Sequence, residues 1–118
     1  MKIREILSKG EPTLSFEVFP PKTEDKYESV EHAVLEIARL KPAFMSVTYG
    51  AGGGTSRYTV DIAATVQAQG VTPLAHLTCV SSTREKVVSV LEELKARGIE
   101  NVLALRGDIP VGGQVEKD

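Results

Sequence analysis

Four short apolar or alternating runs recur along the chain at intervals of roughly thirty residues, the length of a βαβ unit. The first of these runs alternates apolar and polar residues up to the pair Pro20-Pro21, so successive side chains point to opposite faces of a strand. The runs predict four strands, at Thr13–Phe19, Phe44–Thr48, Thr72–Cys79 and Asn101–Leu105.

Each gap between the runs carries a helical pattern. Helices are expected over Tyr27–Leu40, Tyr58–Gln69 and the stretch from Ser82 to Arg97, with Gly70 and Gly98 as left-handed stops. Ser82 and Glu85 have the spacing of a capping box. The apolar stripes predicted to be buried are Val30, Val34, Ile37 and Leu40 in the first helix, and Val87, Val90, Leu91 and Leu94 in the third.

Alternating strands and helices indicate the α/β class, with right-handed crossovers and a parallel sheet. Four strands and three helices correspond to half of a (β/α)8 TIM barrel. An open doubly wound sheet is the alternative, but its glycine fingerprint is missing from the first strand-to-helix turn, which reads Pro20-Pro21-Lys22. The later cluster Gly50–Gly54 has Thr55 at the last glycine position, and the segment after Leu105 has no periodicity and is expected to be a loop.

Charge and cysteine content limit the classes of function that this chain can have. The 118 residues carry 14 Lys plus Arg against 16 Asp plus Glu, which argues against nucleic acid or a membrane surface and favours a small ligand. One cysteine, Cys79, allows no intramolecular disulfide. The first residues lack the apolar stretch of a signal peptide, and no later segment has the length of a membrane span. A cytoplasmic protein is expected.

Polar residues fall at the carboxyl end of every predicted strand, where barrel enzymes carry their active sites. They are Glu17, Thr48, Tyr49, His76, Thr78, Cys79, Arg106 and Asp108. A carboxylate within an apolar strand is costly to bury, which favours a functional Glu17 over a structural ion pair.

The other residues have structural alternatives. His76 could equally be a hydrogen-bonded core histidine, and Thr48 an ordinary β-branched strand residue. Arg106 and Asp108 could form a local ion pair or a turn in which Gly107 permits the bend. Cys79 is interpreted as a small buried residue. Ligand spacing for a metal is absent, as is the Gly-x-Ser-x-Gly elbow of a serine hydrolase.

Four segments together resemble one family. "SFEVFPPKT", "SVTYGAGGGTS", "PLAHLTCV" and "VLALRGDIP" look like successive signature segments of methylenetetrahydrofolate reductases, in the same order and at similar separations. The resemblance extends from Leu14 to Pro110. It implies a flavoprotein of one-carbon metabolism and methionine biosynthesis, in which NADH or NADPH reduces FAD and FAD reduces 5,10-methylenetetrahydrofolate to 5-methyltetrahydrofolate.

The resemblance also assigns roles to residues. Glu17 matches the general acid that assists opening of the folate ring, a role that needs a carboxyl group protonated near neutral pH; burial at a barrel mouth would favour that form. Asp108 matches an aspartate near flavin and folate, where its charge opposes a flavin anion and favours an iminium cation. The cofactor-binding positions are matched by Thr48, Tyr49, Ala51, His76, Arg106 and Gly107, together with Asp108.

A complete barrel has eight strands, so residues 1–118 are interpreted as the amino-terminal half of one barrel domain, with later cofactor and folate contacts outside them. Homo-oligomerisation is expected, because a four-strand half-barrel leaves two sheet edges open. The alternative function is therefore a non-catalytic half-barrel that associates with itself. A visible flavin spectrum bleached by NAD(P)H distinguishes the reductase from this alternative.

Overall fold

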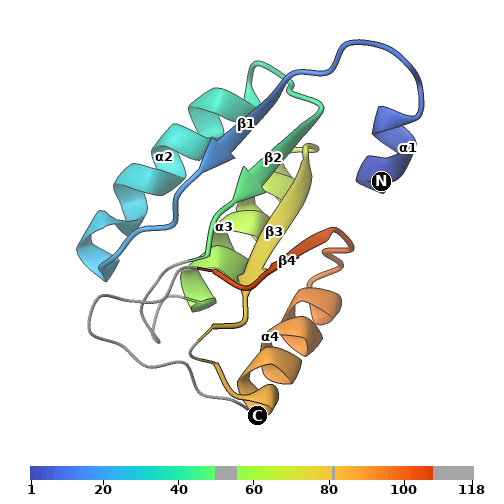
Figure 1. The fold of residues 1–118 in the computed structure, drawn as a ribbon. Helices are drawn as coiled ribbons and strands as arrows, with labels where there is room; N and C mark the ends of the chain where they lie inside the picture. Colours follow the sequence, from blue (N-terminus) through green and yellow to red (C-terminus); the bar gives the residue numbers. More distant parts are fainter. Residues whose placement is uncertain (50–55, 81, 108–118) are drawn as a thin grey trace.

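The computed structural model describes residues 1–49, 56–80 and 82–107, which form a parallel sheet flanked by helices (Figure 1). The four strands and three long helices expected from the sequence are confirmed. In chain order the elements are α1 (Ile3–Leu7), β1 (Ser15–Val18), the 3₁₀ turn η1 (Glu24–Lys26), α2 (Tyr27–Ala38), β2 (Phe44–Val47), α3 (Ser56–Ala68), β3 (Thr72–Thr78), α4 (Arg84–Ala96) and β4 (Val102–Leu105).

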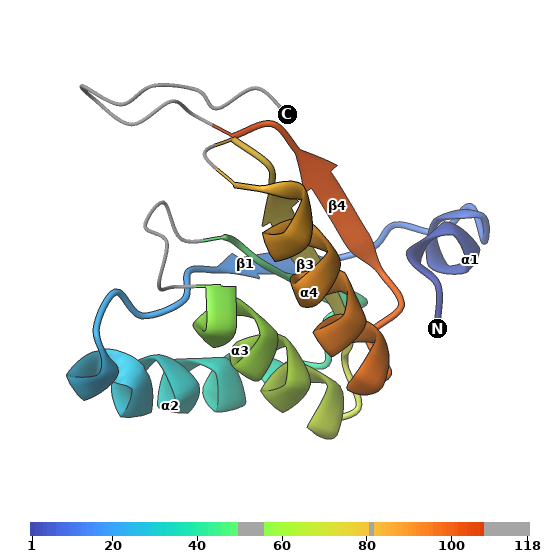
Figure 2. The same ribbon diagram turned by 90° about the horizontal axis from the view of Figure 1, so that it is seen from below.

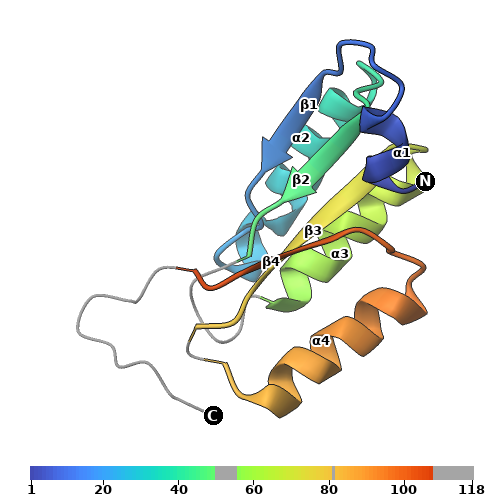
Figure 3. The same ribbon diagram turned by 45° about the vertical axis from the view of Figure 1, so that its right-hand side comes forward.

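The strands lie in the order β1-β2-β3-β4, and each neighbouring pair is parallel. Figures 2 and 3 show α2, α3 and α4 on the same face of this sheet. A doubly wound sheet carries helices on both faces, whereas consecutive βα units of a barrel carry them on the outer face alone. The described residues therefore form part of a (β/α)8 barrel, and the open doubly wound alternative is wrong.

The hydrophobic core lies between the sheet and these helices. Every second residue of β2 and β3 is buried, as the two-residue period of a strand requires. Met45, Val47 and Ala75 are 0% exposed and belong to one cluster with Val34 of α2 and Ile62 of α3. The intervening side chains project from the opposite, helix-free face, which is called the open face below.

The ends of the helices follow the sequence signals with one exception. Gly70 and Gly98 have positive φ angles of 81° and 74°, which confirms them as left-handed stops. The capping box at Ser82 is wrong, because Thr83 is the N-cap of α4. The Thr83 backbone is extended, and its side-chain oxygen accepts a hydrogen bond from the backbone N–H of Lys86 at 3.2 Å.

Two residues of the predicted apolar stripes are exposed. Leu40 is 66% exposed because α2 ends earlier, at Ala38. Leu91 is 41% exposed on α4, the last described helix of the row (Figure 2). The edge strand β4 is also exposed along its whole length. Apolar side chains are therefore left uncovered at the β4 end of the sheet.

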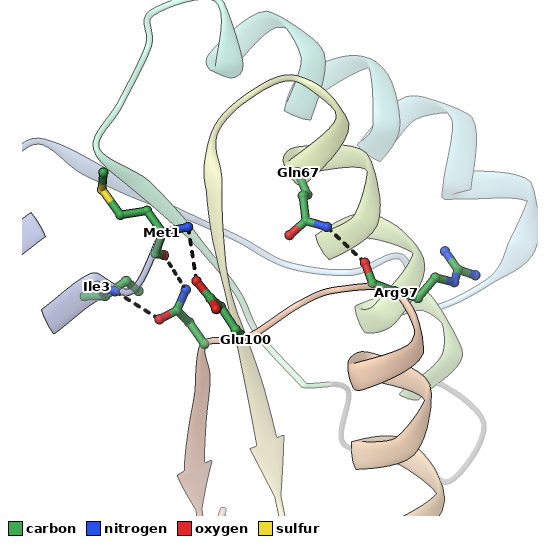
Figure 4. Close-up of polar contacts among 6 residues, drawn as sticks. Met1, Ile3, Gln67, Arg97 and Glu100 are labelled. Carbon is green, nitrogen blue, oxygen red and sulfur yellow. Dashed lines mark hydrogen bonds and ion pairs between the residues drawn. The ribbon is translucent and has the colours of Figure 1, made fainter. Parts of the chain in front are cut away.

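The short helix α1 was not expected from the sequence. Its backbone is held by Asn101, whose amide group donates to the carbonyl of Met1 at 2.9 Å and accepts from the N–H of Ile3 at 3.0 Å. The amino group of Met1 also lies 3.2 Å from a carboxylate oxygen of Glu100 (Figure 4). These contacts join α1 to the amino end of β4, at the end of the sheet opposite the candidate site.

Candidate functional site at the carboxyl ends of the strands

The structure brings two of the predicted site residues together on the open face. Glu17 of β1 and His76 of β3 are separated by the intervening strand β2, yet Oε1 of Glu17 lies 3.7 Å from Nε2 of His76. Ser46 of β2 pairs in register with Glu17 and with Leu74 of β3, so His76 lies two residues further along β3 than the register partner of Ser46. The sequence offered an ion pair as the structural alternative for Glu17, but it did not identify His76 as the partner.

The environments of the two partners differ. The side chain of His76 is 11% exposed and that of Glu17 is 52% exposed. The expected burial of Glu17 is therefore wrong for the described residues, because the open face that carries it is uncovered. The carboxylate is accessible to a ligand, while the imidazole beside it is fixed in the sheet.

Thr48 and Tyr49 follow β2 directly. The N–H of Thr48 donates to the carbonyl of Val18 at 3.0 Å, so the backbone of β2 stays paired with β1 up to the candidate site. The carbonyl of Thr48 accepts a hydrogen bond of 3.0 Å from Oγ1 of Thr59, which is 1% exposed. Tyr49 packs against the edge of the core. Thr59 is a supporting residue that the sequence did not reveal, since a threonine within a helical pattern carries no distinctive signal.

Gly107 lies where β4 ends beside β3. It has a positive φ of 84°, and a Cβ atom at this position would lie 2.9 Å from Cβ of Thr78. The carbonyl of the exposed residue Arg106 accepts a hydrogen bond from the N–H of Val80 at 2.8 Å. The expectation that Gly107 permits a bend is confirmed, and the close approach adds a second reason for glycine.

The remaining predicted residues are Cys79, Thr78, Ala51 and Asp108. Cys79 is exposed, so its interpretation as a buried residue is wrong. Thr78 lies at the end of β3 beside Gly107. Ala51 and Asp108 lie outside the described residues.

Neither a metal site nor a membrane-spanning helix is present among the described residues. In residues 1–49, 56–80 and 82–107, no three His, Cys, Asp or Glu side chains gather in a group that could hold a metal ion. No helix of this part of the chain is long and apolar enough to cross a membrane.

Comparison with known proteins places this arrangement in a family. The family model of methylenetetrahydrofolate reductase matches residues 2–118. The chain belongs to the methylenetetrahydrofolate reductase family. The sequence resemblance is thereby confirmed, and the pair formed by Glu17 and His76 lies in a half-barrel of this family.

Individual relatives agree with this assignment. The chain is 42% identical over 112 residues to "Methylenetetrahydrofolate reductase (NADH) 1" of Arabidopsis thaliana, covering 94% of this chain and 19% of the relative. It is 38% identical over 105 residues to the 5,10-methylenetetrahydrofolate reductase of Pectobacterium carotovorum, covering 88% and 35%. The enzyme of the same name from Escherichia coli K12 is 35% identical over 104 residues, covering 87% and 35%. The chain thus spans a fifth to a third of these relatives.

Proposed function

We propose that this chain is the amino-terminal half of the catalytic barrel of a flavin-dependent reductase, which converts 5,10-methylenetetrahydrofolate to 5-methyltetrahydrofolate with NADH or NADPH. Membership of the reductase family supports this proposal. The observation on this chain that supports it best is the accessible carboxylate of Glu17 on the open face of the sheet.

Glu17 is proposed as the proton donor to the folate. Opening the five-membered ring of the substrate breaks a carbon–nitrogen bond, and the departing nitrogen needs a proton as the iminium ion forms. Because the Glu17 side chain is half-exposed, a ligand seated against the open face can reach its oxygens. Asp108 is proposed to favour the iminium cation by its negative charge, as the family resemblance implies.

The described residues at the carboxyl ends of the strands suit a flat heteroaromatic cofactor. A ligand of this kind needs apolar surface for its rings and a few polar groups for its edges. Leu103 and Leu105 of β4 provide exposed apolar surface, 40% and 38% exposed, and His76 provides an imidazole whose side chain is nearly buried. The residues proposed to hold FAD are Thr48, Tyr49, Ala51, His76, Arg106, Gly107 and Asp108. A bound flavin supplies the hydride transfer between nicotinamide and folate.

Titration of the purified chain with FAD tests whether this half of the barrel contributes to the cofactor site. Quenching of flavin fluorescence, followed by bleaching of the visible spectrum on addition of NADH, is the expected result. Leu105→Lys would remove apolar surface and should weaken FAD binding, whereas Leu7→Lys, on α1 at the opposite end of the sheet, should leave it unchanged. Equal binding by both variants would contradict the assignment of the cofactor to this end.

A second candidate function is self-association of the half-barrel without catalysis. It is favoured by the two unpaired sheet edges and by the exposed apolar side chains of β4, which are Val102, Leu103 and Leu105. Two copies related by a twofold axis would place β4 of each beside β1 of the other, giving eight parallel strands. Sedimentation of the purified chain should then show a dimer that Leu103→Glu dissociates. A monomer at all concentrations would rule this function out.

A further inference from the structure

The proton that Glu17 donates needs a source in each turnover, and the half-exposed carboxyl group is open to its neighbours on the sheet. Histidine is the side chain whose ordinary titration range lies closest to neutral pH. His76 is nearly buried, lies 3.7 Å from Glu17 and approaches it with Nε2. In the described part of the chain, Glu17 is the acidic residue within ion-pair distance of His76.

We propose that His76 is a positioning residue that supplies a proton to Glu17 in each turnover. This inference rests on the proposed function of Glu17 as the acid and extends it to the source of the proton. In the resting pair the imidazolium of His76 faces the carboxylate of Glu17, which holds the carboxylate over β2. In each turnover the Nε2–H bond of His76 breaks and an O–H bond forms on Glu17, which then gives this proton to the folate nitrogen and becomes a carboxylate again. The electron pair stays on Nε2, and solvent protonates the imidazole again.

The positions of Glu17 and His76 allow a proton to pass between them. A separation of 3.7 Å is longer than a hydrogen bond, so Glu17 must rotate toward His76 before the proton moves. The exposed carboxylate is free to make this rotation, whereas the packed imidazole is fixed. Ser46, the register partner of Glu17 on β2, is a small residue beside the carboxylate. Glu17 therefore moves between the folate and the imidazole, while His76 keeps its position.

Other ionisable groups near the pair lie at the ends of neighbouring strands. Cys79 follows β3 and is exposed, and Arg106 follows β4 and is exposed. On β2 the described residues of the open face carry no group that ionises near neutral pH. His32 is exposed on α2, on the helical face of the sheet, and does not take part.

A double-mutant cycle on the purified chain tests the pair without requiring activity. Glu17→Gln, His76→Gln and the double variant are unfolded in urea at pH 5.5 and at pH 9. Near pH 5.5 the imidazolium should couple to the carboxylate by about 1.5- to 5-fold in the unfolding equilibrium constant, and at pH 9 the coupling should vanish. If the two substitutions change the free energy of unfolding additively at pH 5.5, Glu17 and His76 do not interact and the proposed pair is wrong.

The pH profile of folate reduction tests the relay itself, in the protein expressed from its complete reading frame. His76→Gln keeps an amide nitrogen near the position of Nε2 but carries no transferable proton. It should slow folate reduction at least about tenfold near neutral pH, less than the 10²–10⁴ of a positioned acid, and the difference from the wild type should disappear at pH 9, where the pair is uncoupled. Thr72→Val, on the same strand and face but at its opposite end, is the control and should retain the wild-type profile.

The outcomes separate the relay from the proposed function. If Glu17→Gln abolishes folate reduction while His76→Gln has a wild-type pH profile, the acid assignment stands and the relay is wrong. If the coupling is present but Glu17→Gln reduces folate normally, the proposed acid and the relay that depends on it both fail.

Discussion

Gly107→Ala is expected to destabilise the fold by about 2–5 kcal/mol, as the sum of backbone strain and a steric collision. The φ angle of Gly107 is +84°, in the left-handed region where a Cβ atom costs about 1–2 kcal/mol. The added Cβ would lie 2.9 Å from Cβ of Thr78, and 3.1 Å from Cγ2 of Thr78 and from Cγ1 of Val80. Both neighbours are β-branched and held in or beside β3, so moving them costs roughly a further 1–3 kcal/mol, as for overpacking in a core.

Gly70→Ala is the matched control. Gly70 has nearly the same φ angle, +81°, but an added Cβ would meet nothing within 4 Å. It should therefore lose only the backbone contribution of about 1–2 kcal/mol. The difference between the two variants measures the close approach of β4 to β3 at the candidate site.

Urea unfolding followed by far-UV circular dichroism provides both free energies from midpoints and slopes. Gly107→Ala should unfold at clearly lower urea than Gly70→Ala, with slopes similar to that of the wild type. Equal losses of stability in the two variants would refute the reasoning, because they would leave no steric contribution at Gly107.

Three further predictions concern other supports of the fold. Asn101→Ala removes both side-chain hydrogen bonds to the segment of α1 and should lower the free energy of unfolding by about 1–3 kcal/mol. Amide hydrogen exchange should become faster at residues 3–7 alone. Unchanged exchange at these residues would contradict the proposed anchoring of α1. Thr59→Val leaves the carbonyl of Thr48 without its donor and should cost about 1–2 kcal/mol in urea unfolding; an unchanged urea midpoint would be contrary evidence. Burial, and then the negative charge of Asp61, raises the pKa of Tyr27 above its ordinary 10.0, so the folded chain holds the phenolic proton more tightly than the unfolded chain. The resulting stability is present below pH 10.0 and is lost as the pH rises through the raised pKa; Tyr27→Phe should reduce this alkaline loss, and identical alkaline unfolding curves would exclude the effect.

The architecture was predictable because local patterns and tertiary packing agree. The alternation in β2 and β3 and the stops at Gly70 and Gly98 are local properties of the sequence, and the structure confirms them. Helix α1 was not predictable in this way. Its few residues depend on hydrogen bonds to Asn101, about a hundred positions away along the chain, so no local pattern reveals them.

The candidate site was predictable in position but not in detail. The rule that barrel enzymes use the carboxyl ends of their strands selected both Glu17 and His76. Their contact across β2 depends on the relative placement of three strands, which a reading of each strand by itself does not provide. The expected burial of Glu17 and Cys79 failed, because an apolar strand sequence does not show which of its faces is covered.

The central proposal is that Glu17 is the acid of folate reduction. The most direct test follows the visible flavin absorbance of the protein expressed from its complete reading frame, first with NADH and then with 5,10-methylenetetrahydrofolate. The Glu17→Gln variant should be bleached by NADH at the wild-type rate and then reoxidised by the folate at least about 100-fold more slowly than the wild type. Reoxidation of Glu17→Gln at the wild-type rate would contradict the assignment.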